Sequence, residues 1–346
     1  MTRAGHIKPA LFALAMAQAA CLHPARDDNC RPVELASFDI AYNAVLITVT
    51  INGAGYVFMV DTGGYVSTLA PGVADALHLK PAPVEHGLEI YMADGTVLDQ
   101  FVTVDDLQLG LSKTGGVRFV VQPLKSRAGL EYFSGTLAPD FLHNFDLDFD
   151  FGNRKLNLMS PGQCPGKGAY WSVNAIEVPF RTDKANHIVV PVKLDGVQTT
   201  AVVDTGASST VMSQELARRA FGLAPNKGLE ALPNATGRSL VQFQHVFQTL
   251  KLNGVEIDDL PIGILPDEMA KSALSRHEFK MADRRPTGPV MNADPVIIGI
   301  DVLRKFHLYV DYKNETLYVT SADASYNESP PEQPITPAAT QPAPTP

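Results

Sequence analysis

Two stretches of the chain alternate apolar and polar positions, and each predicts a β-strand. In Val45–Ile51 and in Ile188–Leu194, every second position carries Val, Ile or Leu, which is the period of a half-buried strand. Each stretch is followed by a dipeptide typical of a tight hairpin, Asn52-Gly53 or Asp195-Gly196, because both turn positions tolerate positive φ. The pattern therefore predicts two similar hairpins in different parts of the chain.

The same order of motifs occurs twice, which indicates an internal duplication. The tripeptides Asp61-Thr62-Gly63 and Asp204-Thr205-Gly206 each follow a short apolar strand and lie 143 positions apart. Farther along, Asp140–Ser160 is similar to Asp301–Ser321 at an offset of 161. The offsets differ by 18, so the second copy contains extra residues. We expect them in the polar stretch Pro266–Pro295, where the alternation disappears.

Short helices are predicted at equivalent places in the two copies. One pair is expected at Pro71–Leu79 and Ser213–Phe221, and a second pair near Phe141–Phe145 and Val302–Phe306, before the final hairpin of each copy. The predicted strands do not alternate with long helices, so a parallel βαβ sheet is not expected. The fold class is therefore mainly β.

The composition excludes several classes of protein. The formal net charge is −9, so a dedicated nucleic-acid partner is not expected, since phosphates require a basic surface. Three Cys residues without a CxxC pair do not make a disulfide-built scaffold or a structural zinc site. The acidic run Asp146–Asp150 lacks the Gly and Glu of a calcium loop and is interpreted as a strand with its acidic side chains pointing outward. No metal and no cofactor is expected.

The two ends of the chain differ from the middle. Residues 1–20 combine basic residues, an apolar run and small residues in the order of a signal peptide. They predict an exported protein, periplasmic or secreted, with lipidation of Cys21 and an amphipathic N-terminal helix as alternatives. Cys30 and Cys164 bracket the first copy and are candidates for a disulfide in an exported chain. Residues 326–346 are rich in Pro and predict a disordered tail, and no further stretch predicts a membrane span.

The candidate chemistry lies in the two Asp-Thr-Gly motifs. A carboxylate at the end of a rigid strand is held in place, and the following Gly lets backbone N–H groups approach it. The Thr hydroxyls can bond across to the other copy. Two such carboxylates about 3 Å apart cannot both ionise and share one proton. Asp61 and Asp204 are therefore candidates for a general acid and a general base that activate one water molecule.

The motif segments resemble the active-site loops of retropepsin-type aspartic peptidases. The similarity lies in Met59–Thr68 and Val203–Met212, and continues in Thr136–Leu142 and Ile297–Leu303. It covers about residues 38–160 and 176–321. The resemblance implies two tandem retropepsin-like or pepsin-like β-barrel lobes related by a pseudo-twofold axis. The lobes are expected at 31–165 and 171–325.

The resemblance also implies that one monomer, whose lobes pair with each other, hydrolyses an extended peptide or an unfolded protein. It further implies roles for particular residues. Asp61 and Asp204 would be the catalytic residues. Loop support is assigned to Thr62, Gly63, Thr205, Gly206 and Ser208. Hairpin flaps that would cover the substrate are placed around Tyr91, Asp94, Gly95, Thr236 and Gly237.

Two departures from the family pattern keep alternatives open. Gly64 stands where the family has Ala or Ser, and is expected to loosen the first loop. Ala138 stands where the family has Gly, and adds a methyl group. One alternative is therefore a peptide-binding pseudo-protease of the same fold with weak or absent turnover. A further alternative is that each copy pairs with a second chain instead of with its sister.

Overall fold

The computed structural model describes residues 36–41, 44–84, 90–91, 97–122, 133–161, 170–172, 174–225, 227–232, 241, 243–267 and 295–322. All of them belong to one of the two units into which the chain divides, Arg31–Pro346. The predictions for the signal peptide, Cys21, Cys30, Cys164 and the tail lie outside the described residues. Within the described part of the chain, no helix is both long enough and apolar enough to cross a membrane.

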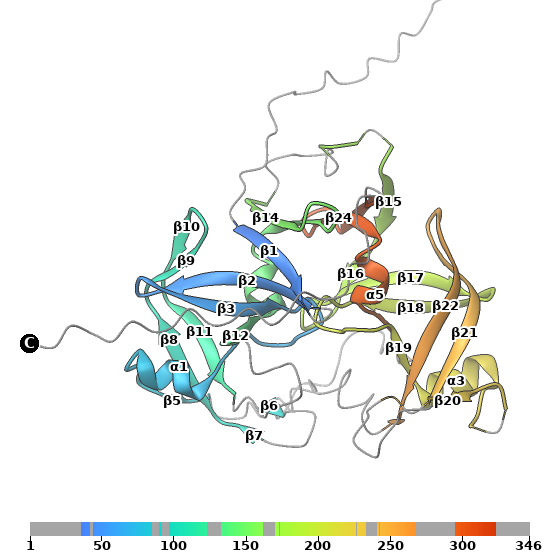
Figure 1. The fold of residues 1–346 in the computed structure, drawn as a ribbon, viewed down its shortest axis with the longest axis horizontal. Helices are drawn as coiled ribbons and strands as arrows, with labels where there is room; N and C mark the ends of the chain where they lie inside the picture. The colour runs from blue at the N-terminus through green and yellow to red at the C-terminus, as the bar shows by residue number, and fades with distance from the viewer. Residues whose placement is uncertain are drawn as a thin grey trace, which may run out of the picture. The chain divides into compact units, whose positions relative to one another are not determined.

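The first lobe follows the predicted plan and lies on the left in Figure 1. Its elements are β1 (Ala36–Ala41), β2 (Ala44–Ile51), β3 (Ala54–Val60), β4 (Thr68–Leu69), α1 (Pro71–Ala76), β5 (Ala82–Pro83), β6 (Ile90–Tyr91), β7 (Val97–Leu98), β8 (Gln100–Val104), β9 (Leu107–Leu109), β10 (Ser112–Thr114), β11 (Val117–Val121), β12 (Gly135–Leu137), α2 (Pro139–Leu142), β13 (Asp146–Asp150) and β14 (Lys155–Met159).

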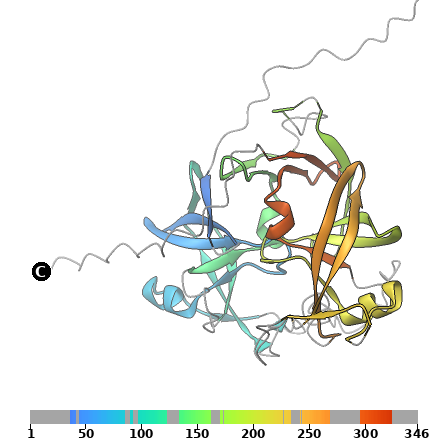
Figure 2. The ribbon, with the colours of Figure 1, turned by 45° about the vertical axis from the view of Figure 1, so that its right-hand side comes forward.

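The second lobe lies on the right in Figure 1, and its long β21–β22 hairpin comes forward in Figure 2. Its elements are β15 (Ile176–Pro179), β16 (Arg181–Thr182), β17 (Ile188–Leu194), β18 (Val197–Val203), β19 (Val211–Ser213), α3 (Gln214–Phe221), β20 (Glu230–Ala231), β21 (Phe243–Leu252), β22 (Val255–Leu265), β23 (Val296–Ile298), α5 (Ile300–Leu303), β24 (Phe306–Asp311) and β25 (Thr316–Ser321).

The predicted hairpins are confirmed as antiparallel pairs, β2 with β3 and β17 with β18. Their turns use positive φ at both central residues, 50° and 82° at Asn52-Gly53 and 44° and 83° at Asp195-Gly196, as a tight hairpin requires. The alternating apolar residues of both strands are buried and contribute to the main hydrophobic core. Burial of this face fixes the register, because a slip of one residue would expose it.

The strand register also locates the extra residues of the second copy. In the first lobe Val120 of β11 pairs with Thr68, and in the second lobe Gly263 of β22 pairs with Val211, so both pairs keep the offset of 143. The next strands, β12 and β23, are related by the offset of 161, since their first residues are Gly135 and Val296. The extra residues therefore lie between β22 and β23, as the sequence predicts.

Six neighbouring strands of a 15-stranded sheet join the two lobes, in the order β15-β25-β24-β13-β14-β1, and β1 continues the sheet into β2. Leu147 pairs with Val310, and Phe149 pairs with Leu308. At the offset of 161, Leu147 corresponds to Leu308 and Phe149 corresponds to Val310. The offset therefore converts each of these two pairs into the other. The pseudo-twofold axis therefore passes between β13 and β24, at the pair Asp148 and Tyr309.

The outward orientation expected for the acidic residues of β13 is wrong. Asp146 and Asp148 are 2% and 0% exposed. The Asp148 carboxylate bonds His307 Nε2 at 2.6 Å and accepts from Asn157 Nδ2 at 2.8 Å and from the Tyr170 hydroxyl. Trp171, next to Tyr170 in the link between the lobes, stacks on His307 with ring centroids 3.7 Å apart. The face expected to be exposed is thus covered by the interlobe link and by the other lobe.

Candidate functional site

The two motif aspartates occupy equivalent places at the ends of β3 and β18. The Asp61 N–H donates to the Leu137 carbonyl at 2.9 Å, and the Asp204 N–H donates to the Ile298 carbonyl at 3.0 Å. Each strand ends beside a parallel neighbour, β12 or β23. Each carboxyl group is therefore attached to backbone that is bonded into a sheet on both sides, which limits its movement.

Reciprocal hydrogen bonds from two threonines tie the motif loops together. Thr62 Oγ1 donates to the Val203 carbonyl at 2.8 Å and accepts the Thr205 N–H at 3.0 Å. Thr205 Oγ1 donates to the Val60 carbonyl at 2.7 Å and accepts the Thr62 N–H at 3.1 Å. Both threonines are buried, at 0% and 1% exposure. Because buried polar groups lose stability when a partner is removed, this closed network holds the two loops at a fixed distance.

The structure brings Asp61 and Asp204 together, and their carboxyl groups hydrogen bond to each other. The motif glycines make this approach possible. A Cβ atom at Gly63 would overlap the Asp204 carboxyl group, and a Cβ atom at Gly206 would overlap the Asp61 carboxyl group. Each glycine thus leaves the space that the aspartate of the opposite lobe occupies. This adds to its expected role, which is to let backbone N–H groups approach the carboxylate of its own motif.

The two carboxyl groups have different hydrogen-bond partners. Asp204 Oδ1 accepts the N–H groups of Gly206 at 2.8 Å and Ala207 at 3.1 Å. Asp61 Oδ1 accepts the Gly63 N–H at 3.2 Å, whereas the Gly64 N–H donates to the Asp61 backbone carbonyl. More backbone donors face Asp204, so its anionic form is the better stabilised of the two.

The pKa shifts follow this asymmetry. Desolvation and then the charge of Asp204 raise the pKa of Asp61 to about 8. Desolvation also raises the pKa of Asp204, but the backbone donors and the hydrogen bond from Asp61 oppose the rise. At neutral pH these shifts favour a pair that shares a single proton, and Asp61 is the more readily protonated member.

In each lobe a further aspartate, which the sequence analysis did not assign to the site, accepts hydrogen bonds from a residue that follows the motif loop. Asp140 accepts the N–H and hydroxyl groups of Ser67, at 2.9 and 2.7 Å. In the second lobe Asp301 accepts the same two groups of Thr210, at 2.9 and 2.8 Å. The repeat offsets carry the signal, because 143 relates Ser67 to Thr210 and 161 relates Asp140 to Asp301. By contrast, Ser208 is exposed, and no hydrogen bond links its side chain to another described residue.

The two departures from the family pattern, Gly64 and Ala138, are in contact with each other. A Cβ atom at Gly64 would lie 3.2 Å from the Ala138 Cβ and 2.8 Å from Asp61 Oδ2. In the second lobe the equivalent positions are Ala207 and Gly299, and a Cβ atom at Gly299 would overlap backbone atoms of Ser209 and Ala207. Each lobe therefore has one Ala and one Gly at these two positions, in opposite order, and we expect the two departures to compensate each other.

A family model described as aspartyl protease matches residues 47–136 and 190–302, which is more than half of the chain. The chain belongs to the aspartyl protease family. The two matched regions contain both Asp-Thr-Gly motifs, the whole of β3 and β18, and all but the first residues of β2 and β17. One matched region lies in each lobe, so both lobes resemble the family model.

Comparison with solved structures matches 411 chains. One is the crystal structure of a retropepsin-like aspartic protease from Rickettsia conorii, with 16% sequence identity and a TM-score of 0.28. The match covers 43% of this chain and 92% of that chain. A comparison with curated proteins finds no match.

Paired strands flank both predicted flaps. In the first lobe β6 and β7 pair antiparallel, with Tyr91 opposite Val97. In the second lobe β20 pairs with β21, with Ala231 opposite Phe243. Asp94, Gly95, Thr236 and Gly237 lie outside the described residues, so their role as flaps stays a prediction.

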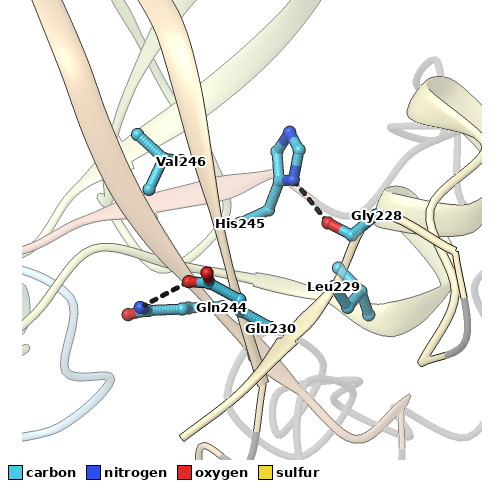
Figure 3. A pocket seen from close by; sticks show the side chains of 6 residues that line it. All are labelled: Gly228, Leu229, Glu230, Gln244, His245 and Val246. Carbon is cyan, nitrogen blue, oxygen red and sulfur yellow. Dashed lines mark hydrogen bonds between the residues drawn. The ribbon is translucent and has the colours of Figure 1, made fainter.

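One pocket lies apart from the motif residues (Figure 3). His245 Nδ1 bonds the Gly228 carbonyl at 2.6 Å, and Gln244 donates to Glu230 at 3.3 Å. Its lining consists of Gly228, Leu229, Glu230, Gln244, His245 and Val246. In the described part of the chain, no group of three or more His, Cys, Asp or Glu side chains is arranged to hold a metal ion.

Proposed function

We propose that this chain is an aspartic endopeptidase that cleaves peptide bonds with Asp61, Asp204 and one water molecule. Family membership supports protease activity in general. The observation that carries the proposal is the hydrogen-bonded contact between two carboxyl groups with different donor sets. Two titratable groups whose environments separate their pKa values are suited to act as acid and base.

In the proposed mechanism the two aspartates exchange protons with the substrate and with water. The Asp204 carboxylate removes a proton from the water, whose oxygen attacks the scissile carbonyl carbon, while Asp61 donates its proton to the carbonyl oxygen. A neutral tetrahedral diol results. Asp204 then gives its proton to the leaving nitrogen as the C–N bond breaks, and Asp61 recovers a proton from the diol. The pair returns to its starting state without a covalent intermediate.

The substrate we propose is an extended peptide, held by hairpins that close over the carboxyl pair. The antiparallel pairing of β6 with β7, on either side of the first predicted flap, supports this part of the proposal. We also propose that one chain suffices, because the cross-lobe threonine bonds lie within a single polypeptide. Sedimentation should then find the active species to be a monomer, and activity confined to a dimer would contradict this.

The first test compares Asp61→Asn and Asp204→Asn with the parent on a peptide library. Each variant should lose about 10²–10⁴-fold in kcat/KM, the usual contribution of a general acid or base. Asp106→Asn is the matched control, since Asp106 is an exposed partner of Lys113, and it should cleave like the parent. If both motif variants cleave normally, the proposed mechanism is wrong. If the parent binds peptides and cleaves none, the pseudo-protease alternative holds instead.

A further inference from the structure

A buried histidine lies beside the carboxyl pair, outside the two motifs. His187 is 5% exposed and comes directly before β17. The turn that precedes it is built by Asp183, whose Oδ1 accepts the N–H groups of Ala185 at 2.8 Å and of His187 at 3.0 Å. Asn186 in this turn has a φ of 62°. The turn therefore fixes the position of the His187 backbone, from which the imidazole ring extends.

Both ring nitrogens of His187 face acceptors. Nδ1 lies 2.8 Å from Asp183 Oδ2, and Nε2 lies 3.1 Å from the carbonyl oxygen of Gly64 in the other lobe. A carbonyl oxygen accepts only, and so does an ionised carboxylate. A neutral imidazole has a single N–H and satisfies one of these bonds, whereas the imidazolium form satisfies both. The geometry thus selects the cationic form of His187.

This cation acts on both motif loops. Through Gly64 it bonds the loop of Asp61, and its charge favours the ionised forms of Asp204 and Asp61. We propose that His187, oriented by Asp183, is a positioning residue that holds the Asp61 loop from the second lobe and stabilises the single negative charge of the carboxyl pair. This inference rests on the proposed function only where it concerns catalysis.

The groups that face His187 agree with this assignment. Burial opposes its charge, yet the hydrogen bond to Asp183 and the charges of Asp183 and Asp204 raise the pKa of His187 overall. Burial would raise the pKa of Asp183, but the hydrogen bond and the charge of His187 lower it overall. Tyr65, next to Gly64, adds no charge at neutral pH, because desolvation and the nearby Asp183 and Asp140 raise its pKa to about 12.

Comparison of the two copies shows that only the second lobe has this pair. At the offset of 143, His187 corresponds to Ala44 and Asp183 corresponds to Ile40, so the first lobe has neither group. The threonine network and the Ser67–Asp140 type of support occur in both lobes, whereas the His187–Asp183 pair occurs in one. It therefore distinguishes the environments of the two aspartates.

The catalytic test is the pH profile of kcat/KM for His187→Gln. Gln can still donate to the Gly64 carbonyl but carries no charge. Without the cation, both apparent pKa values of the carboxyl pair should rise, so both limbs of the profile should move up by about one pH unit. A merely structural role would lower the rate at every pH and leave both limbs in place, and that result would overturn the inference.

The control is His78→Gln. His78 is exposed and follows α1, outside the motif loops and the predicted flaps. Its profile should coincide with that of the parent. A shift equal to that of His187→Gln would show that the effect is not specific to the cation beside the carboxyl pair.

A second measurement is independent of turnover and does not require His187→Gln to fold. Nitrogen NMR of the labelled full chain should find both ring nitrogens of His187 protonated at pH 7. In Asp183→Asn, and in the double variant Asp61→Asn/Asp204→Asn that removes the charge of the pair, the ring should lose its proton at a lower pH than in the parent. A neutral ring at pH 7, or a titration unchanged by the double variant, would overturn the inference. Failure of the parent to cleave any peptide would overturn the proposed function alone.

Discussion

Small residues set the separation of the carboxyl pair. Gly63 and Gly206 leave room for the aspartate of the opposite lobe, and the contact between Gly64 and Ala138 leaves room for one methyl group. Protein interiors are packed densely enough that one added methyl group is felt. The positions of the Asp61 and Asp204 carboxyl groups thus depend on neighbouring residues with a very small side chain or none.

The compensation between Gly64 and Ala138 can be tested by a double-mutant cycle. Gly64→Ala should displace the Asp61 carboxyl group and lower kcat/KM by about tenfold or more, since the new Cβ lies 2.8 Å from Asp61 Oδ2. Adding Ala138→Gly should recover part of the loss, because it reproduces the arrangement of Ala207 and Gly299. Strictly additive effects of the two changes would contradict the compensation.

Sequence alone predicted the motif residues well and their surroundings less well. The positions of Asp61 and Asp204 followed from a repeated tripeptide at the ends of two apolar strands. The contact of His187 with Gly64 joins residues 123 positions apart and has no counterpart in the repeat. No local pattern predicts such a contact, because it depends on how the two lobes pack.

At the scale of elements, the shared sheet holds a buried polar cluster around Asp148. The strand β13 was predicted correctly, but its acidic face was assigned to solvent. Alternation predicts which residues share a face and does not reveal what covers that face. Here Tyr170 and Trp171 of the interlobe link, together with His307 of β24, cover it.

Removal of Asp148 should destabilise the protein far more than removal of an exposed carboxylate. Asp148→Ala leaves the buried Asn157 and the half-buried His307 and Tyr170 without their acceptor, and should lower the free energy of unfolding by about 3 kcal/mol. Asp106→Ala breaks an exposed ion pair with Lys113 and should cost about 0.5 kcal/mol. Urea denaturation of both variants measures the difference. Equal losses would show that the Asp148 cluster does not stabilise the junction of the lobes.

At the scale of the whole molecule, the duplication determined most of what the sequence could predict. Two offsets located the hairpins, the motif loops and the extra residues before β23. The helices were placed correctly, although α2 and α5 begin two residues earlier than expected, at Pro139 and Ile300. Their boundaries depend on packing against β12 and β23, which a single sequence does not show.

The carboxyl pair should also make the stability of the folded chain depend on pH. The pKa of Asp61 rises from an ordinary 3.8 to about 8. Between these values the folded chain holds a proton that the unfolded chain has released, so the free energy of unfolding falls as pH rises. Asp61→Asn does not titrate and should therefore be more stable than the parent at pH 7.5, by about 2 kcal/mol.

The check is a denaturation series at several pH values. The gain from Asp61→Asn should shrink steadily as the pH is lowered from 7.5 to 4.5, because both states of the parent then approach the protonated form. Asp106→Asn should show no comparable trend. A gain that is the same at both pH values, or a loss at pH 7.5, would contradict the raised pKa.

The pair on the pseudo-twofold axis, Asp148 and Tyr309, has a consequence for how the two halves can pair. A true symmetric dimer places each residue of the axis opposite a copy of itself. If the first half of the chain dimerised in this way, two buried Asp148 side chains would face each other, and like charges directly opposite in a sheet repel. The first half is therefore unsuited to pair with a copy of itself through this strand, because Tyr309 of the second half supplies an uncharged neighbour for Asp148 at the centre of the molecule.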